Sequence, residues 1–283
     1  MNKIIRALGK PYFQEDNCLI YNLDCLEGMA KLPNEIINMT VTSPPYNIGK
    51  EYEDILSLDE YLAWCKRWIQ EVYRLTTING SFWLNLGYIS IPKRAKAIPI
   101  SYLLWDKIPF YLIQEIVWNY GAGVAAKKFF SPRNEKFLWY VKDELNYIFN
   151  LDDIRDPNVK YPNQKKNGKI KVNPMGKNPT DVWQIPKVTS GKNRASKERT
   201  PHPCQYPIAV IDRIIKASSN KGDLILDPFL GSGTTAIVAL KLDRSVIGFE
   251  INSDYCEMAV KRIKTFKSEK QTDVIQFSLF GSV

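Results

Sequence analysis

The sequence predicts an α/β protein in which helices cover both faces of a mostly parallel, twisted sheet. One observation is an apolar run at residues 36–41 that ends at two consecutive prolines, as a buried strand does where its ladder stops. Another is the stretch 222–236, an apolar strand pattern that passes through a glycine-rich turn into a helix. The third is helical periodicity between the predicted strands, strongest at residues 58–75.

The remaining elements follow from the spacing of apolar residues and turn residues. We expect residues 1–17 to form an arm, and residues 274–280 to form an edge strand or a dimer contact. Between them the patterns predict strands at residues 19–22, 36–41, 80–87, 112–118, 137–141, 222–227 and 244–250, and helices at residues 24–32, 58–75, 98–105, 208–219 and 254–264.

Residues 42–47, Thr-Ser-Pro-Pro-Tyr-Asn, follow the first of the long predicted strands. Each proline fixes φ and lacks an N–H, so the loop is rigid and its carbonyl groups are available as acceptors. Ser43 adds a small hydroxyl and Tyr46 a flat aromatic face at the carboxyl edge of the sheet, where open α/β sheets bind ligands. This combination predicts a clamp for a planar base that carries an amino group. The alternative is a Pro-Pro strand end with a packed tyrosine.

The second candidate stretch has the pattern of a nucleotide-binding turn. Gly231, Gly233 and Ala236 match G-x-G-x-x-G/A between a predicted strand and a predicted helix. Glycines at these positions permit a tight turn and a close approach of the backbone to a ligand. Glu250 ends the next predicted strand, 19 positions after Gly231. An acid at about that distance accepts hydrogen bonds from a ribose diol.

Together the two stretches resemble the DNA amino-methyltransferases that use S-adenosyl-L-methionine. The matching segments are residues 43–46, Ser-Pro-Pro-Tyr, and residues 227–235, Asp-Pro-Phe-Leu-Gly-Ser-Gly-Thr-Thr. Here the catalytic motif precedes the cofactor motif, which is the circularly permuted order of the beta group. The resemblance covers nearly the whole chain apart from roughly residues 150–200 and the C-terminal tail. It implies a Rossmann-like methyltransferase fold, with residues 1–283 as one catalytic domain and an inserted target-recognition segment at about residues 150–200.

The resemblance also implies roles for individual residues. The implied catalytic residues are Ser43, Pro44, Pro45 and Tyr46. The implied S-adenosyl-L-methionine site comprises Asp24, Cys25, Asp227, Phe229, Gly231, Ser232, Gly233, Thr234, Thr235 and Glu250. Asp24 can equally cap the predicted helix at residues 24–32. The family has a similar aromatic and charged loop, at residues 129–135 here, that helps to hold the target base. The resemblance also implies that a His-Pro-x-Gln-x-Pro element, residues 202–207, lines the methionine side of the cofactor. No metal is needed for this chemistry.

The formal net charge of +9 is concentrated in one segment. Residues 158–200 hold eleven Lys or Arg against two acids, Asp181 and Glu198, so the rest of the chain is close to neutral. The segment also has four prolines, three glycines and few apolar residues, a composition typical of a solvated loop. The family places its target-recognition segment in this interval, and the charge favours contact with double-stranded DNA. Residues 181–186, Asp-Val-Trp-Gln-Ile-Pro, are expected to anchor the segment to the body.

The residue before the two prolines bears on the target base. Family members that act on adenine N6 mostly carry Asp or Asn there, and those that act on cytosine N4 mostly carry Ser. Ser43, with Thr42 before it, therefore favours the exocyclic N4 amine of a flipped cytosine. Adenine N6 remains the alternative, because both bases present an amine beside a ring-nitrogen acceptor. A catalytically inactive DNA-binding relative, and an enzyme that acts on RNA or a small molecule, are further hypotheses.

The composition also indicates the cellular compartment and the partners of the protein. Five cysteines without a C-x-x-C pairing, and no export signal, predict reduced thiols in a cytoplasmic protein. All apolar runs are shorter than the roughly 18 residues of a membrane span, so we expect no membrane partner. His202 is the single histidine, which excludes a histidine-rich metal site. The resemblance implies a restriction-modification system, with a cognate restriction endonuclease as a further partner, and leaves a homodimer open.

Overall fold

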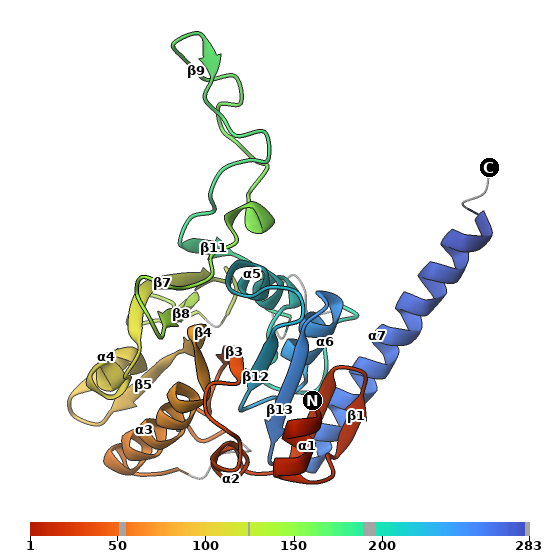
Figure 1. Cartoon of the computed structure of the whole chain (residues 1–283). Coiled ribbons are helices and arrows are strands. Elements are labelled where there is room, and N and C mark those ends of the chain that lie inside the picture. The colour runs from red at the N-terminus through yellow and green to blue at the C-terminus, as the bar shows by residue number, and fades with distance from the viewer. Residues whose placement is uncertain (51–54, 124, 189–195, 281–283) are drawn as a thin grey trace.

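The computed structural model describes residues 1–50, 55–123, 125–188 and 196–280, and of residues 269–280 only the backbone. A nine-stranded mixed sheet forms the centre of the molecule (Figure 1). Its strands lie in the order β1-β2-β13-β12-β3-β4-β8-β7-β11. In that order their bounds are Phe13–Glu15, Cys18–Asn22, Ser245–Glu250, Leu224–Asp227, Ile37–Thr42, Thr76–Leu86, Asn134–Val141, Tyr111–Asn119 and Val182–Gln184.

The direction of the strands decides which loops meet. The five strands from β2 to β4 in this order are mutually parallel. β8 runs antiparallel to both β4 and β7, and β11 is parallel to β7. The carboxyl ends of β3, β12, β13, β7 and β11 and the amino end of β8 therefore share one edge of the sheet. Both predicted site segments, the loop after β3 and the turn after β12, begin at this edge.

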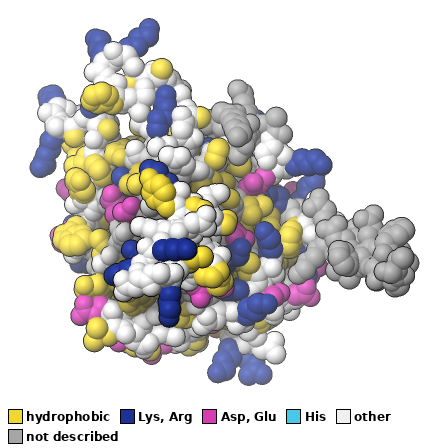
Figure 2. Space-filling view, turned by 90° about the horizontal axis from the view of Figure 1, so that it is seen from above, with side chains coloured by type: hydrophobic (Ala, Val, Ile, Leu, Met, Phe, Trp, Pro, Cys, Tyr) yellow, Lys and Arg dark blue, Asp and Glu magenta, His cyan; other side chains and the backbone are white. Residues whose placement is uncertain are grey.

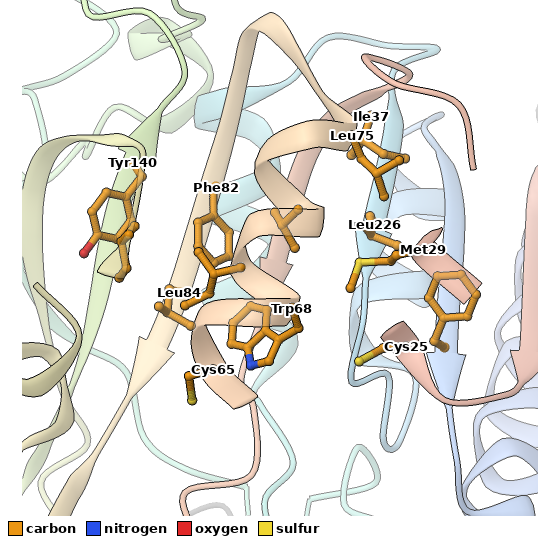
Figure 3. Packing of buried hydrophobic residues seen from close by; sticks show 14 of the residues in the cluster. Cys25, Met29, Ile37, Cys65, Trp68, Leu75, Phe82, Leu84, Tyr140 and Leu226 are labelled. Atoms are coloured by element: carbon orange, nitrogen blue, oxygen red, sulfur yellow. The ribbon is translucent and has the colours of Figure 1, made fainter. Parts of the chain in front are cut away.

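One face of the sheet is covered by α1 (Asn2–Leu8), α2 (Cys25–Ala30), α3 (Leu58–Leu75) and α4 (Ile100–Leu104). α3 begins at a capping box, in which Ser57 and Glu60 each accept from the other's backbone N–H. Its apolar stripe enters the core, where the fully buried Trp68 meets Phe82 of β4 edge to face at 6.1 Å between ring centroids (Figure 3). The predicted helix at residues 58–75 is confirmed, and its stripe is core.

The other face is covered by α5 (Ile208–Ser218), α6 (Thr234–Lys241) and α7 (Ser253–Phe280). Successive strand residues point to opposite faces, so Ile225 packs in this second cluster while Leu226 packs in the first. The predicted class, a mostly parallel sheet with helices on both faces, is confirmed. None of the helices in the described part of the chain is long and apolar enough to cross a membrane.

The basic insert forms a projecting arm, residues 157–176, that stands away from the body (Figure 1). Near its tip the short strands β9 (Lys165–Lys166) and β10 (Lys169–Ile170) pair antiparallel. Asn167 and Gly168 join them with φ of 52° and 75°, the left-handed values that a tight two-residue hairpin requires.

Two contacts close the arm at its base. The backbones of Asp156 and Lys177 exchange hydrogen bonds of 2.9 and 3.0 Å. Gly176 has φ of 106°, and a Cβ there would come 2.3 Å from the Asp156 carbonyl oxygen, so only glycine fits this crossing. The arm is therefore a closed loop with a defined start and end.

The anchor predicted at residues 181–186 is confirmed by β11. Trp183 in this strand is 6% exposed and lies against the rings of Trp83 and Phe137, with centroid distances of 6.1 and 6.4 Å. The guanidinium of Arg213 lies 5.1 Å from the Trp183 ring centroid. A 3₁₀ helix, Leu151–Ile154, packs against α5 just before the arm begins.

Three local predictions were wrong. Residues 1–17 contain α1 and β1 instead of an arm, because Ile4 is buried in the core and β1 pairs with β2. The helix predicted at residues 98–105 starts later, because β6 (Ala95–Pro99) first pairs with β5 (Tyr88–Ile91); after α4 a 3₁₀ turn covers Trp105–Lys107. Residues 274–280 are part of α7, so the edge strand is wrong, and the alternative of a dimer contact stays a prediction.

Candidate active site

A cavity of about 1020 Å³ lies at the carboxyl edge of the sheet. The loop after β3 and the turn between β12 and α6 both line it, although they lie far apart in the sequence. The predicted site residues that line the cavity are Asp24, Cys25, Ser43, Pro44, Pro45, Tyr46, Phe229, Gly231, Ser232, Thr234, Thr235 and Glu250. Asp227 and Gly233, also predicted for the site, lie behind this lining.

A chain of hydrogen bonds holds the loop after β3. Ser43 Oγ donates to the Tyr46 hydroxyl oxygen at 3.0 Å, and the Tyr46 hydroxyl donates to Asn85 Oδ1 at 2.8 Å. Tyr61 of α3 donates to the Pro45 carbonyl oxygen at 2.9 Å. Burial raises the pKa of Tyr46 well above its usual value of 10, so its hydroxyl stays protonated as a donor. Because Ser43 gives its hydrogen to Tyr46, the lone pairs of the Ser43 oxygen remain as acceptors.

The position of the Tyr46 ring depends on a glycine in the neighbouring strand connection. A Cβ on Gly87 would come 2.8 Å from Cε2 of Tyr46, closer than carbon atoms pack. Gly87 follows β4 directly, two positions after Asn85. The end of β4 therefore sets both the hydrogen bond and the ring position of Tyr46.

Asp227 joins the loop after β3 to the glycine-rich turn. Its carboxylate accepts from Thr42 Oγ1 at 2.7 Å and from Thr235 Oγ1 at 2.6 Å. The backbone N–H of Phe229 donates to the same carboxylate at 3.2 Å. Burial raises the pKa of Asp227 from 3.8 to about 6, and the hydrogen bonds only partly oppose this shift. Asp227 therefore works as an internal brace between β3, β12 and α6.

The carboxylate of Glu250 accepts a hydrogen bond from the glycine-rich turn. The Gly231 N–H donates to Glu250 Oε2 at 2.8 Å, and the Asn252 N–H donates to Glu250 Oε1 at 2.9 Å. Gly231 and Gly233 have φ of 50° and 76°, the left-handed region that favours glycine. Burial raises the pKa of Glu250 despite these bonds. Each carboxylate oxygen keeps a further lone pair, so a ribose diol could also be bound there.

Arg262 of α7 braces the far side of the turn. Its Nη1 donates to the Ser232 carbonyl at 2.6 Å and contacts the hydroxyls of Ser232 and Thr234, each at 3.1 Å. Burial lowers the pKa of Arg262 from 12.5 to about 10, and Glu198 opposes this shift. The sequence held no signal for this role, because an arginine on a predicted helix is usually solvated.

Asp24 and Cys25, at the start of α2, line the same cavity. Asp24 caps α2 by accepting from the N–H groups of Leu26 at 2.8 Å and Glu27 at 3.3 Å, so the capping role is confirmed while the residue also lines the cavity. Cys25 is buried, and burial raises the pKa of its thiol. Phe229 packs its ring edge to face on Trp68 of α3 at 5.2 Å.

The His-Pro-x-Gln-x-Pro element also reaches the cavity. A Cβ on Gly231 would come 2.8 Å from His202 Nε2, so the imidazole lies directly on the cofactor turn. Burial, and then the charge of Arg262, lowers the pKa of His202 from 6.5 to about 4, so the ring is neutral near pH 7. Gln205 fixes the element, since its amide accepts from the Thr200 N–H at 2.8 Å and donates to the Glu198 carbonyl at 2.6 Å.

Sequence reasoning missed three residues on the cavity wall: Asn85, Tyr120 and Lys187. Asn85 lies near the end of the predicted strand at residues 80–87, where a polar residue in an apolar run was the available signal. The loop at residues 129–135 does line the cavity, through Phe129, Phe130, Ser131, Pro132, Asn134 and Glu135. Lys187 follows the anchor strand β11 and gave no signal, because the whole insert is rich in lysine.

This architecture is that of a methyltransferase, and solved structures of such enzymes superpose on it. PvuII DNA methyltransferase (cytosine-N4-specific) aligns with a TM-score of 0.70 at 21% identity, over 92% of this chain and 94% of that one. A DNA modification methylase from Thermus thermophilus, solved in complex with S-adenosyl-L-methionine, aligns with a TM-score of 0.59 at 19% identity, over 89% and 96%. S-adenosyl-L-methionine is the cofactor of this protein.

Sequence comparison identifies the family. The model of the N6/N4 DNA methylases matches residues 37–261, and the chain belongs to this family. Type II methyltransferase M.ScaI of Streptomyces caespitosus is 62% identical over 92% of this chain and 86% of its own length. DNA adenine methyltransferase YhdJ of Escherichia coli K12 is 36% identical over 85% of this chain and 80% of its own length.

Proposed function

We propose that this DNA methyltransferase transfers the methyl group of S-adenosyl-L-methionine to the exocyclic N4 amine of a cytosine flipped out of double-stranded DNA. The observation that carries the proposal is Ser43, which stands before the two prolines and lines the same cavity as the cofactor turn. In the resemblance drawn from the sequence, a serine at this position favours cytosine over adenine. The target must leave the duplex because its amine cannot reach an enclosed cavity from within the base stack.

The residues of the cavity supply position and acceptors. When bound, the cofactor supplies an electrophilic methyl on a sulfonium leaving group. The Ser43 oxygen, whose own hydrogen is given to Tyr46, accepts from one amine hydrogen, and the Pro44 carbonyl accepts from the other. These acceptors favour a tetrahedral nitrogen with its lone pair toward the methyl. Such orientation is worth up to about 7–11 kcal/mol in favourable cases. The loop is suited to this because Tyr61 and Asn85 hold it rigidly.

Methylation of adenine N6 is the second candidate. It is favoured by the relative YhdJ, whose name specifies adenine and which covers most of this chain. Digestion of methylated DNA to nucleosides, followed by mass spectrometry, separates the two. N4-methylcytosine is the expected product, and N6-methyladenine as the sole product would refute the cytosine assignment. Sequencing of methylated sites in expressing cells would give the recognition sequence at the same time.

We assign Glu250 to the ribose of the cofactor, because it lies at the end of β13 and one of its carboxylate oxygens accepts from the Gly231 N–H in the turn. Glu250→Gln keeps the shape but replaces one acceptor oxygen with an amide donor. Calorimetric titration should show S-adenosyl-L-methionine affinity reduced by about tenfold or more, since a hydrogen bond to a charged group contributes about 1.5–3 kcal/mol. Unchanged affinity in a folded variant would contradict this assignment.

The arm is proposed to contact the DNA backbone. Its residues 157–176 include five lysines and no acid, and the four lysines near its tip, Lys165, Lys166, Lys169 and Lys171, are exposed. Side chains of Lys and Arg stand out from the surface in the view from above, on the side of the arm (Figure 2). Exposed cations on a projecting arm attract a polyanion such as the DNA backbone.

Replacing the four tip lysines with glutamine tests the contact. Each lost phosphate contact reduces the dependence of log K on log salt by about 0.9, so the slope should flatten by up to about 3 to 4. The matched control replaces four exposed lysines elsewhere, Lys3, Lys31, Lys66 and Lys221, and removes the same total charge. Equal slopes for the two variants would show that the arm adds only net charge.

We further propose that the protein belongs to a restriction-modification system, because M.ScaI is a Type II methyltransferase and is similar over most of its length. DNA from cells that express the protein should resist one restriction endonuclease from a panel while remaining sensitive to the others. Expression of the Ser43→Ala variant is the control, and it should leave the DNA sensitive. Sensitivity to every endonuclease tested, despite complete methylation at mapped sites, would count against this role.

A further inference from the structure

An ion pair lies in the wall of the active-site cavity, beside the catalytic loop. Lys187 Nζ contacts Glu135 Oε1 at 2.5 Å, and both side chains line the cavity with 23% and 18% of their surface exposed. The negative charge of Glu135 contributes to the raised pKa of Tyr46, after burial itself. The pair is therefore within electrostatic range of the residues proposed to hold the target amine.

Three strands fix this pair in position. Ile185, just after β11, donates its N–H to the Asn119 carbonyl at 3.1 Å and accepts from Trp118 Nε1 at 2.7 Å. These bonds tie the segment that carries Lys187 to the end of β7. Glu135 is the second residue of β8, whose amino end lies at the same edge. The positions of both charges are thus set by the sheet.

Aromatic rings complete the surroundings of the ammonium group. Lys187 Nζ lies 3.9 Å from the ring centroid of Tyr120 and 5.6 Å from that of Trp118. Burial by itself lowers the pKa of Lys187, but the charge and hydrogen bond of Glu135, together with Tyr120 and Cys204, raise the pKa overall. The lysine is therefore a permanent cation on the cavity wall.

Partial burial of an ion pair has a desolvation cost, and apolar residues of similar size would often be at least as stable. An ammonium group has three N–H donors and Glu135 takes one of them, so the group can also donate to a ligand in the cavity.

Cytosine presents two adjacent acceptors beyond its amine, ring atom N3 and the 2-oxo oxygen. Adenine presents only N1 there, because the next ring position is a C–H group.

We propose that Lys187, held by Glu135, donates a hydrogen bond to the acceptor edge of the flipped cytosine and so makes the cavity selective for cytosine over adenine. The inference rests on the proposed cytosine N4 activity. A site built to donate to a substrate acceptor discriminates against an analogue without it, because a buried donor is then left unpaired. Glu135 is a positioning residue in this scheme, since it orients the ammonium group.

The test is single-turnover methyl transfer with saturating S-adenosyl-L-methionine on duplexes that carry the mapped methylation site. One duplex contains cytosine, and the other a cytosine analogue that keeps the amine and the ring nitrogen but lacks the 2-oxo group. The wild type should lose about 10- to 100-fold in rate on the analogue, the range for a charged hydrogen bond. Lys187→Met should lose a similar factor on cytosine and should discriminate less than threefold between the two duplexes.

Two further variants separate recognition from structure. Lys187→Met with Glu135→Gln removes both charges and so leaves no unpaired carboxylate, and it should show the same loss of discrimination. Lys187→Arg keeps a donor and should retain part of the discrimination between the two duplexes. If Lys187→Met lowers the rate equally on both duplexes, or leaves the cytosine rate unchanged, the proposal is refuted. Product analysis of the wild type stands apart from these results, because N6-methyladenine would refute the proposed function instead.

Discussion

The brace at Asp227 gives a prediction about stability and pH. Asp227 is fully buried, and its pKa is raised from 3.8 to about 6 because burial disfavours the charged form. A carboxyl whose pKa is raised by folding contributes stability below its unfolded pKa, and that stability is lost as the pH rises through its folded pKa. The shift of about two units corresponds to about 3 kcal/mol at 1.36 kcal/mol per unit.

Asp227→Asn removes this titration. The loss of one acceptor oxygen for the hydroxyl of Thr42 or Thr235 lowers stability by a constant amount, but the variant has no carboxyl to ionise. The difference in unfolding free energy, variant minus wild type, should therefore rise by about 2 kcal/mol between about pH 4.5 and pH 7.5, with the rest of the change below that range. Urea unfolding at several pH values measures the difference and cancels the pH dependence of all other groups.

Asp254→Asn is the matched control, because Asp254 is exposed to solvent in α7. This variant shows how much of any change comes from replacing a carboxyl with an amide at an exposed position. If the Asp227→Asn difference is flat, the carboxylate has its ordinary affinity for protons in the folded protein. The description of Asp227 as a desolvated brace would then be wrong.

Three other substitutions have definite outcomes. Tyr46→Phe removes the hydroxyl between Ser43 and Asn85, so methyl transfer should fall about tenfold or more while calorimetric cofactor affinity is unchanged. Gly231→Ala places a Cβ at 2.8 Å from His202 at a positive φ, so cofactor affinity should fall while DNA binding in gel-shift assays is retained. Trp183→Ala leaves a cavity under the arm and should lower the urea-derived stability by about 3–5 kcal/mol.

The parts of the fold that followed from the sequence are those in which local pattern and burial agree. The helix at residues 58–75 matches α3 because its apolar stripe and its cap are both local features. The strand before the two prolines and the strand before the glycine-rich turn are bounded by residues that cannot continue a ladder. In contrast, β1 depends on pairing with β2, and β6 depends on pairing with β5. The sequence of neither strand therefore predicts a strand by itself.

The same distinction holds for the site. Ser43, Gly231 and Glu250 could be found from motif spacing, because each lies next to the turn or strand end that places it. Arg262 and Lys187 could not, because they reach the site by tertiary packing from α7 and from the end of β11. The cofactor role predicted for Asp227 stays a prediction; the structure shows that its carboxylate accepts from three protein donors, which no motif spacing indicated.

The neighbouring positions of β3 and β12 have a consequence for how the gene can be arranged. The two halves of the site meet through strand pairing and the Asp227 carboxylate, and not through the peptide that connects them. The order in which the two halves follow each other along the chain therefore does not decide how they pack. A chain divided near residue 190, after the anchor strand and before α5, should yield two fragments that recover activity when co-expressed. Mixing of separately refolded fragments would measure how strongly the strands themselves drive the assembly.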